Sequence, residues 1–418
     1  MKVFKFGGAS VKDAGSVRNV ASVLKRFPSD NLIVVISAMG KTTNALEHLT
    51  DADFFGKENP ISVLDEIKEY HLDIMKDLFP DTSHSVYPAV EKIFQEIKKR
   101  IDGTPSGDYN KEYDQLVSKG EIISTLIVSE YLNSEGITNK WLDARDLIKT
   151  DSNYREGRVD FEVTGKLISN YFSSFKGIAI TQGFIGKTPD NLTTTLGREG
   201  SDYTAAILAY CTNAESVTIW KDVPGVMNAD PKWFDETKLI GHLSYHDAIE
   251  LAYFGATVIH PKTIKPLQNK KIPLLVKSFL KPAEKGTVIN NEPSQLPIPC
   301  FIFKVNQILL SISPKDFSFI VEENFSDIFN TFSEHKVKIN TMQNSAISFS
   351  VCVDNDSRKI PGLLKKLREN FRVLYNENVE LITIRYYDQS TIDRVCIGKK
   401  VFLEHKSRYT VQLVVKNI

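Results

Sequence analysis

The chain has 418 residues and a formal net charge of zero, with 52 basic and 52 acidic side chains. This length predicts two or more domains, each with enough apolar residues for its own core. There is no basic run and no interleaving of basic with aromatic residues, so small ligands are expected rather than nucleic acid or membrane surfaces. The four cysteines lie far apart without a C-x-x-C pair, which argues against a zinc site and a disulfide framework. No signal region or bilayer-spanning stretch is visible, so we expect a cytoplasmic protein.

Up to residue 290, short β-branched runs alternate with segments of helical period, which predicts an α/β sheet covered by helices on both sides. The expected strands are residues 3–6, 32–37, 140–143, 177–181, 216–220 and 273–278. The expected helices are residues 16–27, 63–78, 113–134 and 244–254. The polar, proline-rich stretch that follows is interpreted as a linker.

The first expected strand runs into Gly7, Gly8 and Ser10, with Lys5 two residues before the first glycine. Glycine lets backbone N–H groups approach an anion, Ser10 adds a hydroxyl donor, and Lys5 adds a positive charge. This layout is typical of phosphate binding, although an ordinary strand–turn connection would leave the same pattern.

A second glycine- and hydroxyl-bearing loop, with Ser37 and Thr43, follows the strand that ends near residue 37. Open α/β sheets bind ligands at the carboxyl ends of their strands, so this loop is a candidate site; an ordinary helix cap is the alternative. Glu121 lies on a largely apolar helix. It either faces solvent, which is the expectation without further context, or is a partly buried anion that needs a cation.

The segment 193–206 carries the strongest signal, because three threonines precede Leu196-Gly197-Arg198-Glu199-Gly200-Ser201-Asp202. Ser201 or Asp202 is expected to cap a helix whose positive end faces an anion, and Arg198 offers a bidentate fork for a carboxylate. Capping alone would need neither Arg198 nor the threonines, so we interpret the segment as functional.

The strand 216–220 is followed by a turn-rich connection with Lys221, Asp222, Met227 and Lys232, which could seat a nucleotide at a strand carboxyl end. Further on, His260 lies where one helix breaks and another begins. We interpret it as a structural histidine rather than a ligand or a base.

Taken together, these segments resemble the aspartate kinases of the amino-acid kinase superfamily over nearly the whole chain. The motifs occur in that family's order and spacing: the opening Lys-Phe-Gly-Gly-Ala-Ser-Val, the Gly-Glu of the central helix, Gly-Phe-Ile-Gly, Thr-Thr-Thr-Leu-Gly-Arg with Gly-Ser-Asp-Tyr, Asp-Val-Pro-Gly, Ala-Asp-Pro, and Phe-Gly-Ala with His-Pro. No dehydrogenase segment is expected after the regulatory region, as in the monofunctional type.

The resemblance implies transfer of the γ-phosphoryl of ATP to the β-carboxylate of L-aspartate, the first step toward lysine, threonine and methionine, with Mg²⁺ carried on ATP and no dedicated protein metal site. A carboxylate needs no general base, so positioning and positive charge must supply catalysis. The implied catalytic residues are Lys5 and Asp202. The implied substrate-binding residues are Ser37, Thr43, Glu121, Arg198 and Ser201. The implied ATP-binding residues are Lys5, Gly7, Gly8, Ser10, Lys221, Asp222, Met227, Lys232 and Thr257.

Some positions differ from the residues usual in the family: Glu199 replaces glycine, Thr257 lysine, Lys221 threonine, Met227 tyrosine and Lys232 arginine. The lysine lost at 257 and the lysine gained at 221 would together move one positive charge to a different position beside the phosphates. Two alternatives stay open, namely a sibling kinase acting on another carboxylate such as glutamate, and a noncatalytic regulatory subunit. The second should have lost Lys5 or the pair of Arg198 and Asp202, and all three are present.

The remaining chain predicts strand 308–313, helix 325–335, strands 337–343 and 347–353, helix 360–370 and strand 371–376, the βαββαβ order of an ACT regulatory module by resemblance. The predicted domains are a catalytic domain at 1–292, a linker at 293–299 and an α+β regulatory region at 300–418. The region would hold one full ACT unit at about 306–378 and a truncated second unit from 300–304 and 379–418, whose segment 388–408 is expected to be too short for a helix plus a strand. A homodimer through this region, with weak or absent effector binding, is expected.

Overall fold

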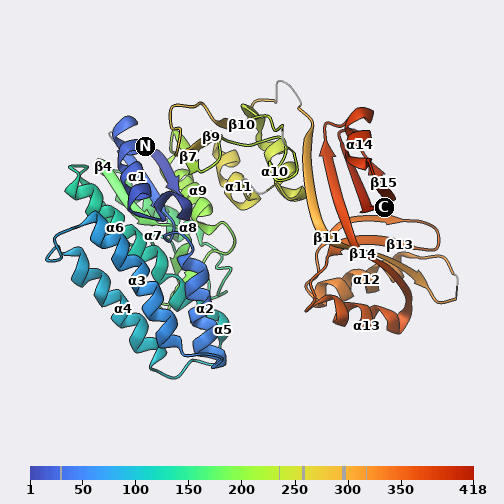
Figure 1. Cartoon of the computed structure of the whole chain (residues 1–418), viewed down its shortest axis with the longest axis horizontal. Coiled ribbons are helices and arrows are strands. Elements are labelled where there is room, and N and C mark those ends of the chain that lie inside the picture. Colours follow the sequence, from blue (N-terminus) through green and yellow to red (C-terminus); the bar gives the residue numbers. More distant parts are fainter. Residues whose placement is uncertain (29–30, 235, 257–258, 294–297, 317) are drawn as a thin grey trace. The chain divides into compact units, whose positions relative to one another are not determined.

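The computed structural model describes all residues except 29–30, 235, 257–258, 294–297 and 317, and it divides the chain into two compact units (Figure 1). Unit 1 comprises Met1–Val226, Leu239–Ile249 and Val258–Ser294. Unit 2 comprises Met227–Lys238, Glu250–Thr257 and Gln295–Ile418, so it takes in two segments that precede the predicted linker. No described helix has both the length and the apolar character that a membrane crossing requires.

Unit 1 is built on an eight-stranded sheet in the order β3-β4-β2-β1-β7-β9-β10-β8. The strands are β1 (Lys2–Phe6), β2 (Asn31–Ile36), β3 (Asn139–Leu142), β4 (Gly177–Gln182), β7 (Ser216–Lys221), β8 (His242–Ser244), β9 (Leu274–Ser278) and β10 (Thr287–Asn290). All neighbours pair in parallel except β9 with β10. Because β1 lies between β2 and β7, the loops that follow these three strands meet at one edge.

Helices cover this sheet, as Figure 1 shows, and the predicted α/β fold is confirmed. They are α1 (Ala14–Arg26), α2 (Thr42–Phe55), α3 (Pro60–Leu78), α4 (Val86–Ile101), α5 (Tyr109–Val117), α6 (Lys119–Ser134), α7 (Ala144–Leu147), α8 (Phe161–Phe172), α9 (Gly200–Thr212), α10 (Tyr245–Phe254) and α11 (Pro261–Lys270), with the 3-10 turn η1 (Gly8–Val11). Side chains of Asp13, Asn59, Asp108 and Asp160 accept backbone N–H groups at the starts of α1, α3, α5 and α8. A separate antiparallel pair, β5 (Ile185–Lys187) with β6 (Thr193–Thr195), follows β4 in the chain.

Two details of the predicted helices are wrong. The single helix expected at 113–134 is divided at Ser118 into α5 and α6. Neither Ser201 nor Asp202 caps α9, because the helix begins at Gly200 and Glu199 stands before it in the left-handed region, with φ of 53°. Ser201 and Asp202 therefore lie in the first turn. This places their side chains beside the N–H groups at the positive end of the helix.

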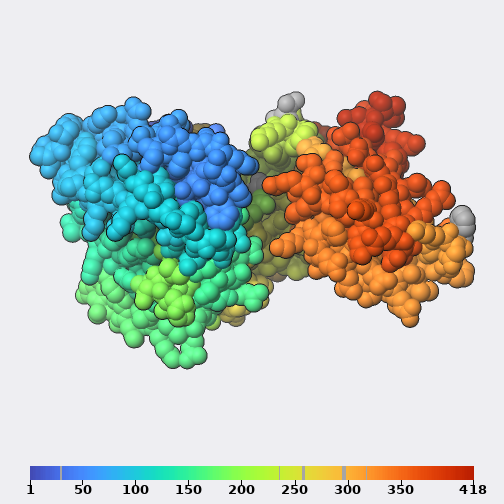
Figure 2. Space-filling view, turned by 90° about the horizontal axis from the view of Figure 1, so that it is seen from below, coloured from blue at the N-terminus to red at the C-terminus, as the bar shows by residue number. Residues whose placement is uncertain are grey.

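Unit 2 contains a six-stranded antiparallel sheet in the order β12-β13-β11-β14-β16-β15. Its elements are β11 (Cys300–Pro314), α12 (Glu322–Glu334), β12 (Ile339–Asn344), β13 (Phe349–Asp354), α13 (Ile360–Asn370), β14 (Phe371–Arg385), α14 (Gln389–Cys396), β15 (Lys399–Lys406) and β16 (Thr410–Asn417). The predicted strands 308–313 and 371–376 are parts of two longer strands, because β11 and β14 each run for 15 residues with a shift of register near Lys304 and Gln307. Figure 2 shows these orange and red residues as one continuous body.

The expectation that 388–408 is too short for a helix and a strand is wrong. Asp388 caps α14 by accepting the Thr391 N–H at 2.8 Å. In return, the Asp388 N–H donates to the Thr391 hydroxyl at 3.0 Å. Ile392 and Val395, three residues apart, are buried in a core with Ile382. The β-branched residues suggested strand, but the cap and the apolar face at helical spacing determine the structure.

Candidate active site

The loops after β1 and β2 pack backbone against backbone. The Gly40 N–H donates to the Gly8 carbonyl at 3.1 Å, and a Cβ on Gly8 would lie 2.8 Å from the Gly40 carbonyl oxygen. Any side chain at position 8 would push the loops apart, which explains this glycine. The buried Ser10 hydroxyl has no hydrogen-bond partner among the described residues, so it is available to a ligand at this edge.

A buried ion pair lies beside this loop. Lys5 Nζ on β1 is 2.6 Å from Asp202 Oδ1 in the first turn of α9, and Lys221 Nζ at the end of β7 is 3.9 Å from Asp202 Oδ2. Lys5 is 8% exposed and Asp202 2% exposed. Removing two charges from water is costly, so a pair kept at the carboxyl edge of a parallel sheet indicates a functional site. The structure thus brings together three of the predicted residues.

Glu121 does not face solvent as first expected, because it is only 2% exposed. Helix α6 is buried on most of its surface, and Gly120 allows it to pack closely, since a Cβ there would lie 3.1 Å from the Ala38 Cβ. Glu121 Oε1 accepts the Ala38 N–H at 3.2 Å, and Oε2 has no partner in the described part of the chain. Burial raises the pKa of Glu121 to about 8, although the Ala38 N–H and the charge of Lys5 act in the opposite direction.

The loop after β4 holds the start of α9 in place. A Cβ on Gly183 would lie 2.3 Å from the Ser201 Cβ, so only glycine permits this approach. The Gly183 N–H donates to the Ile36 carbonyl at 3.1 Å, and the Phe184 N–H donates to the Thr204 hydroxyl at 2.9 Å. This accounts for the glycine that opens the Gly-Phe-Ile-Gly motif and fixes Ser201 beside the ends of β2 and β4.

The other predicted substrate residues are more accessible. Arg198 is exposed in the turn before α9, Ser37 is half-buried after β2, and Thr43 is half-buried in the first turn of α2. The Ser37 carbonyl accepts the Ser124 hydroxyl at 2.7 Å. Neither the Arg198 nor the Thr43 side chain makes a hydrogen bond or ion pair with Lys5, Asp202 or Glu121 within the residues that the structure covers.

Of the predicted nucleotide residues, Gly7 is half-buried and Asp222 is exposed, both in unit 1. Met227 and Lys232 belong to unit 2, where the Lys232 N–H donates to Asp230 Oδ1 at 2.9 Å. Their segment is attached to the six-stranded sheet of unit 2, because the Phe301 N–H donates to the Asn228 carbonyl at 2.7 Å. Thr257 lies outside the described residues.

Glu199 shows why glycine is favoured at its position. Its φ of 53° is strained for a residue with a side chain, and one of its carboxylate oxygens is buried without a partner among the described residues. A glycine would relieve both problems.

The sequence analysis missed Asp114, which is 0% exposed on α5. Its carboxylate accepts hydrogen bonds from Thr195 and from the Arg155 backbone. Burial raises the pKa of Asp114 to about 6, and these hydrogen bonds oppose that effect. The sequence gives little signal for Asp114, because the stretch between it and Glu121 also contains Gln115, Ser118 and Lys119, and its burial depends on donors more than 40 positions away.

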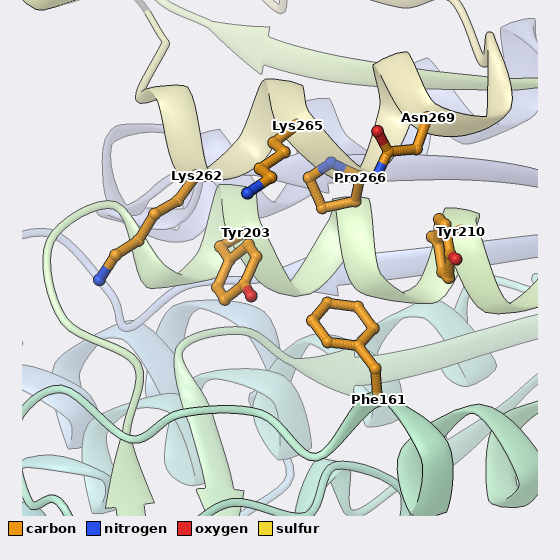
Figure 3. Close-up of a pocket in the computed structure, with 7 residues that line it drawn as sticks. All are labelled: Phe161, Tyr203, Tyr210, Lys262, Lys265, Pro266 and Asn269. Carbon is orange, nitrogen blue, oxygen red and sulfur yellow. The ribbon is translucent and has the colours of Figure 1, made fainter.

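A hollow of about 360 Å³ lies elsewhere on unit 1, among α8, α9 and α11. Figure 3 shows Phe161 opposite Pro266, with Tyr203 and Tyr210 of α9 flanking the space. Its remaining lining residues are Lys262, Lys265 and Asn269. None of the predicted site residues lines it.

Comparison with known proteins places this geometry in a family. The sequence model of the amino acid kinase family matches residues 1–278. Lysine-sensitive aspartokinase 3 of Escherichia coli K12 is 30% identical over 413 residues, which cover 96% of this chain and 90% of that protein. The chain belongs to the aspartokinases.

Other relatives agree. A bifunctional aspartokinase/homoserine dehydrogenase of Zea mays is 33% identical over 302 residues, covering 70% of this aspartokinase and 32% of the maize protein. The crystal structure of E. coli aspartokinase III with aspartate and ADP has a TM-score of 0.84 at 27% identity and covers 99% of this chain and 96% of that one. The predicted family, fold class and ATP-dependent aspartate kinase activity are confirmed.

Proposed function

We propose that this aspartokinase brings the β-carboxylate of L-aspartate against the γ-phosphoryl of ATP at the carboxyl edge of β1, β2 and β7. The observation that carries this assignment is the buried pair of Lys5 and Asp202, 2.6 Å apart, beside the Gly7–Gly8 turn. It supplies a fixed positive charge next to backbone donors, which is what transfer between two anions requires.

In the transfer, a carboxylate oxygen of aspartate forms a bond to the γ-phosphorus while the bond to the β,γ-bridging oxygen breaks, and ADP leaves. The chief obstacle is repulsion, since two unit charges 4 Å apart interact by about 4 kcal/mol at an effective dielectric constant near 20. Lys5 offsets this repulsion, and Asp202 holds the Lys5 ammonium in place. Lys221, 3.9 Å from the second Asp202 oxygen, adds another positive charge on the same side.

We assign the phosphate oxygens to the backbone of Gly7 and Gly8 and to the Ser10 hydroxyl. The unpartnered Ser10 hydroxyl and the backbone contact between the two loops support this role. Asp222, Met227, Lys232 and Thr257 stay predictions for the nucleotide.

We assign the α-carboxylate of aspartate to Arg198, whose guanidinium is exposed and whose planar fork suits a carboxylate. Glu121 would face the ammonium group, because one of its carboxylate oxygens is buried without a partner within the described residues. Ser37, Thr43 and Ser201 would complete the substrate site as hydroxyl donors.

Mg²⁺ would arrive on ATP, where phosphate and water oxygens serve as its ligands and the ion neutralises part of the phosphate charge. The described residues contain no group of three or more His, Cys, Asp or Glu side chains able to hold a metal. Asp202 is the nearest candidate, but both of its oxygens face lysines.

We further infer a cytoplasmic homodimer. The four free cysteines, three of them buried, suit a reducing compartment. Dimerisation through unit 2 follows from its exposed sheet edges and is tested below.

The function is tested by incubating the protein with MgATP, hydroxylamine and one acidic amino acid at a time, because hydroxylamine traps an acyl phosphate as a hydroxamate. We expect efficient trapping with L-aspartate alone, since Arg198 and Glu121 fix the backbone groups and leave only the shorter side chain in reach of ATP. Equal rates with glutamate would contradict the substrate, and amino-acid binding without hydroxamate would indicate a regulatory subunit.

A further inference from the structure

A buried carboxylate outside the reacting groups joins three segments around the substrate site. We propose that Asp114 is a positioning residue for aspartate binding, which holds the Thr195–Arg198 segment in its binding conformation. The inference rests on the proposed role of Arg198 in holding the substrate.

The hydrogen bonds of Asp114 all come from outside its own helix. Asp114 Oδ2 accepts the Thr195 N–H and the Arg155 N–H, each at 2.9 Å. Asp114 Oδ1 accepts the Thr195 hydroxyl at 2.7 Å. In the described part of the chain, three donors and no acceptor contact the Asp114 carboxyl group, and an ionised carboxylate is the group that only accepts hydrogen bonds. These hydrogen bonds satisfy the buried carboxylate, and they link α5 to β6 and to the turn at residue 155.

The Arg155 turn in turn packs against the glycine that precedes Arg198. A Cβ on Gly197 would lie 3.3 Å from the Arg155 carbonyl oxygen, and the Gly157 N–H donates to the Thr195 carbonyl at 2.9 Å. Arg155 has φ of 67°, a conformation that a non-glycine residue keeps only when its surroundings hold it. Asp114 supplies part of that hold through the Arg155 N–H.

The Arg155 side chain extends the network to α2, the helix that carries Thr43. Its guanidinium lies 4.2 Å from the centre of the Tyr113 ring and its Nη2 lies 3.3 Å from Glu47 Oε1. Glu47 is four residues after Thr43 on α2, so the two lie on the same side of that helix. One buried carboxylate thus connects the segments that carry Arg198 and Thr43, both assigned to aspartate and neither to ATP.

Glu112 provides a matched control on the same helix. It is also buried, at 3% exposed, and it accepts hydrogen bonds from the Ser106 N–H at 3.0 Å and from Arg100 Nε at 2.8 Å. Within the described residues, neither Ser106 nor Arg100 forms a hydrogen bond or ion pair with β6 or with the turn at Arg155. Loss of Glu112 should destabilise α5 as loss of Asp114 does, without moving the substrate segment.

The experiment compares Asp114→Ala, Asp114→Asn and Glu112→Ala with the unmodified enzyme, measuring Tm, kcat and the separate KM values for aspartate and ATP. We expect Asp114→Ala to raise the aspartate KM by about 10- to 100-fold, because small displacements of binding groups have effects of that size. The ATP KM should stay within about twofold by the same reasoning, since phosphate-loop contacts do not involve Asp114. Asparagine keeps an acceptor for the two backbone N–H groups, so Asp114→Asn should recover most of the loss.

Glu112→Ala should lower Tm with an unchanged aspartate KM. The proposal is overturned if Asp114→Ala leaves the aspartate KM unchanged, if it raises both KM values alike, or if Glu112→Ala raises the aspartate KM equally. Should Asp114→Ala fail to fold, Thr195→Val, which removes only the hydroxyl donor, must still raise the aspartate KM selectively. Absence of trapping by the unmodified enzyme would instead contradict the proposed function.

Discussion

The two units bury polar groups of different kinds. Among the described residues, unit 1 buries the acidic or basic side chains of Lys5, Glu112, Asp114, Glu121, Asp202 and Asp247, whereas unit 2 buries that of Arg385. The other buried polar residues of unit 2 are neutral, as in the hydrogen bond between Thr341 and Gln412 at 2.9 Å. Buried charge is costly, so a unit retains it where chemistry or positioning needs it. The difference is consistent with the proposed active site in unit 1, and it leads us to propose that the sheet of unit 2 serves mainly for assembly.

The largest effect that this comparison predicts is at Lys5. Lys5→Ala should lower kcat by about 1000-fold with little change in the aspartate KM, because its charge acts chiefly in the transition state. Arg198→Ala should mainly raise the aspartate KM, since its fork holds the ground-state carboxylate as well. Steady-state kinetics with each substrate varied in turn separates the two effects.

Lys166→Ala is the control for removal of a lysine from unit 1, because Lys166 is 71% exposed and pairs only with Glu162 on its own helix in the described contacts. It should change neither constant. The opposite pattern, a KM effect at Lys5 and a kcat effect at Arg198, would show that the roles of the two cations are exchanged.

A smaller effect concerns the protonation of Glu121. Burial raises its pKa to about 8, so in the free enzyme the group is mostly protonated at pH 7 and becomes a carboxylate only above that value. An ammonium group binds the ionised form, so kcat/KM for aspartate should rise between pH 6.5 and about 8.5. Because the folded state holds this proton more tightly than the unfolded chain, whose glutamates titrate near 4.5, the contribution of Glu121 to the free energy of unfolding should fall as pH rises from about 4.5 to about 8 and level off above that.

Glu121→Gln tests this assignment, because glutamine keeps the shape and cannot ionise. The variant should have a raised aspartate KM and a flat profile of kcat/KM over that pH range. An unchanged profile in the variant would assign the pH dependence to another group.

The sequence predicts unit 1 well where a motif is local. Lys5, Gly7, Gly8 and Ser10 lie within six residues, and one strand and turn bring them together. Long-range packing is harder to predict. The burial of Glu121 depends on the loop after β2 reaching α6, and the role of Asp114 depends on Thr195, 81 positions further along the chain.

In unit 2 the sequence predicts where helices and strands lie more reliably than it predicts which segments form one continuous strand. Periodicity identifies α13 at 360–370, as the structure has it. Periodicity does not show that residues 300–304 and 308–313 belong to one strand. The strand continues across a shift of register, and such a shift depends on the partner strand β14, which the local sequence does not reveal. The sequence analysis does not predict helix α14, because its β-branched residues favour a strand. Asp388, which caps the first turn, marks where the helix starts.

The smallest expected effect concerns regulation, and it tests whether unit 2 binds an amino-acid effector. The segment 340–345 offers amides where an amino-acid ligand would need an acid for its ammonium group. The Asn340 side chain is already engaged, since Nδ2 donates to Gln307 Oε1 at 2.8 Å and Oδ1 accepts Lys304 Nζ at 2.9 Å. We therefore expect lysine and threonine to inhibit weakly or not at all.

The sheet of unit 2 would then act mainly in dimerisation. Its edge strands β12 and β15 carry mostly exposed or half-buried side chains, and an open edge pairs readily with another chain. Titrating lysine and threonine against hydroxamate formation, with light scattering to measure mass, should give an undiminished rate and the mass of a dimer. Tight inhibition by either amino acid would show that the effector pocket is built from backbone groups instead, and a monomer at micromolar concentration would contradict the dimerisation role.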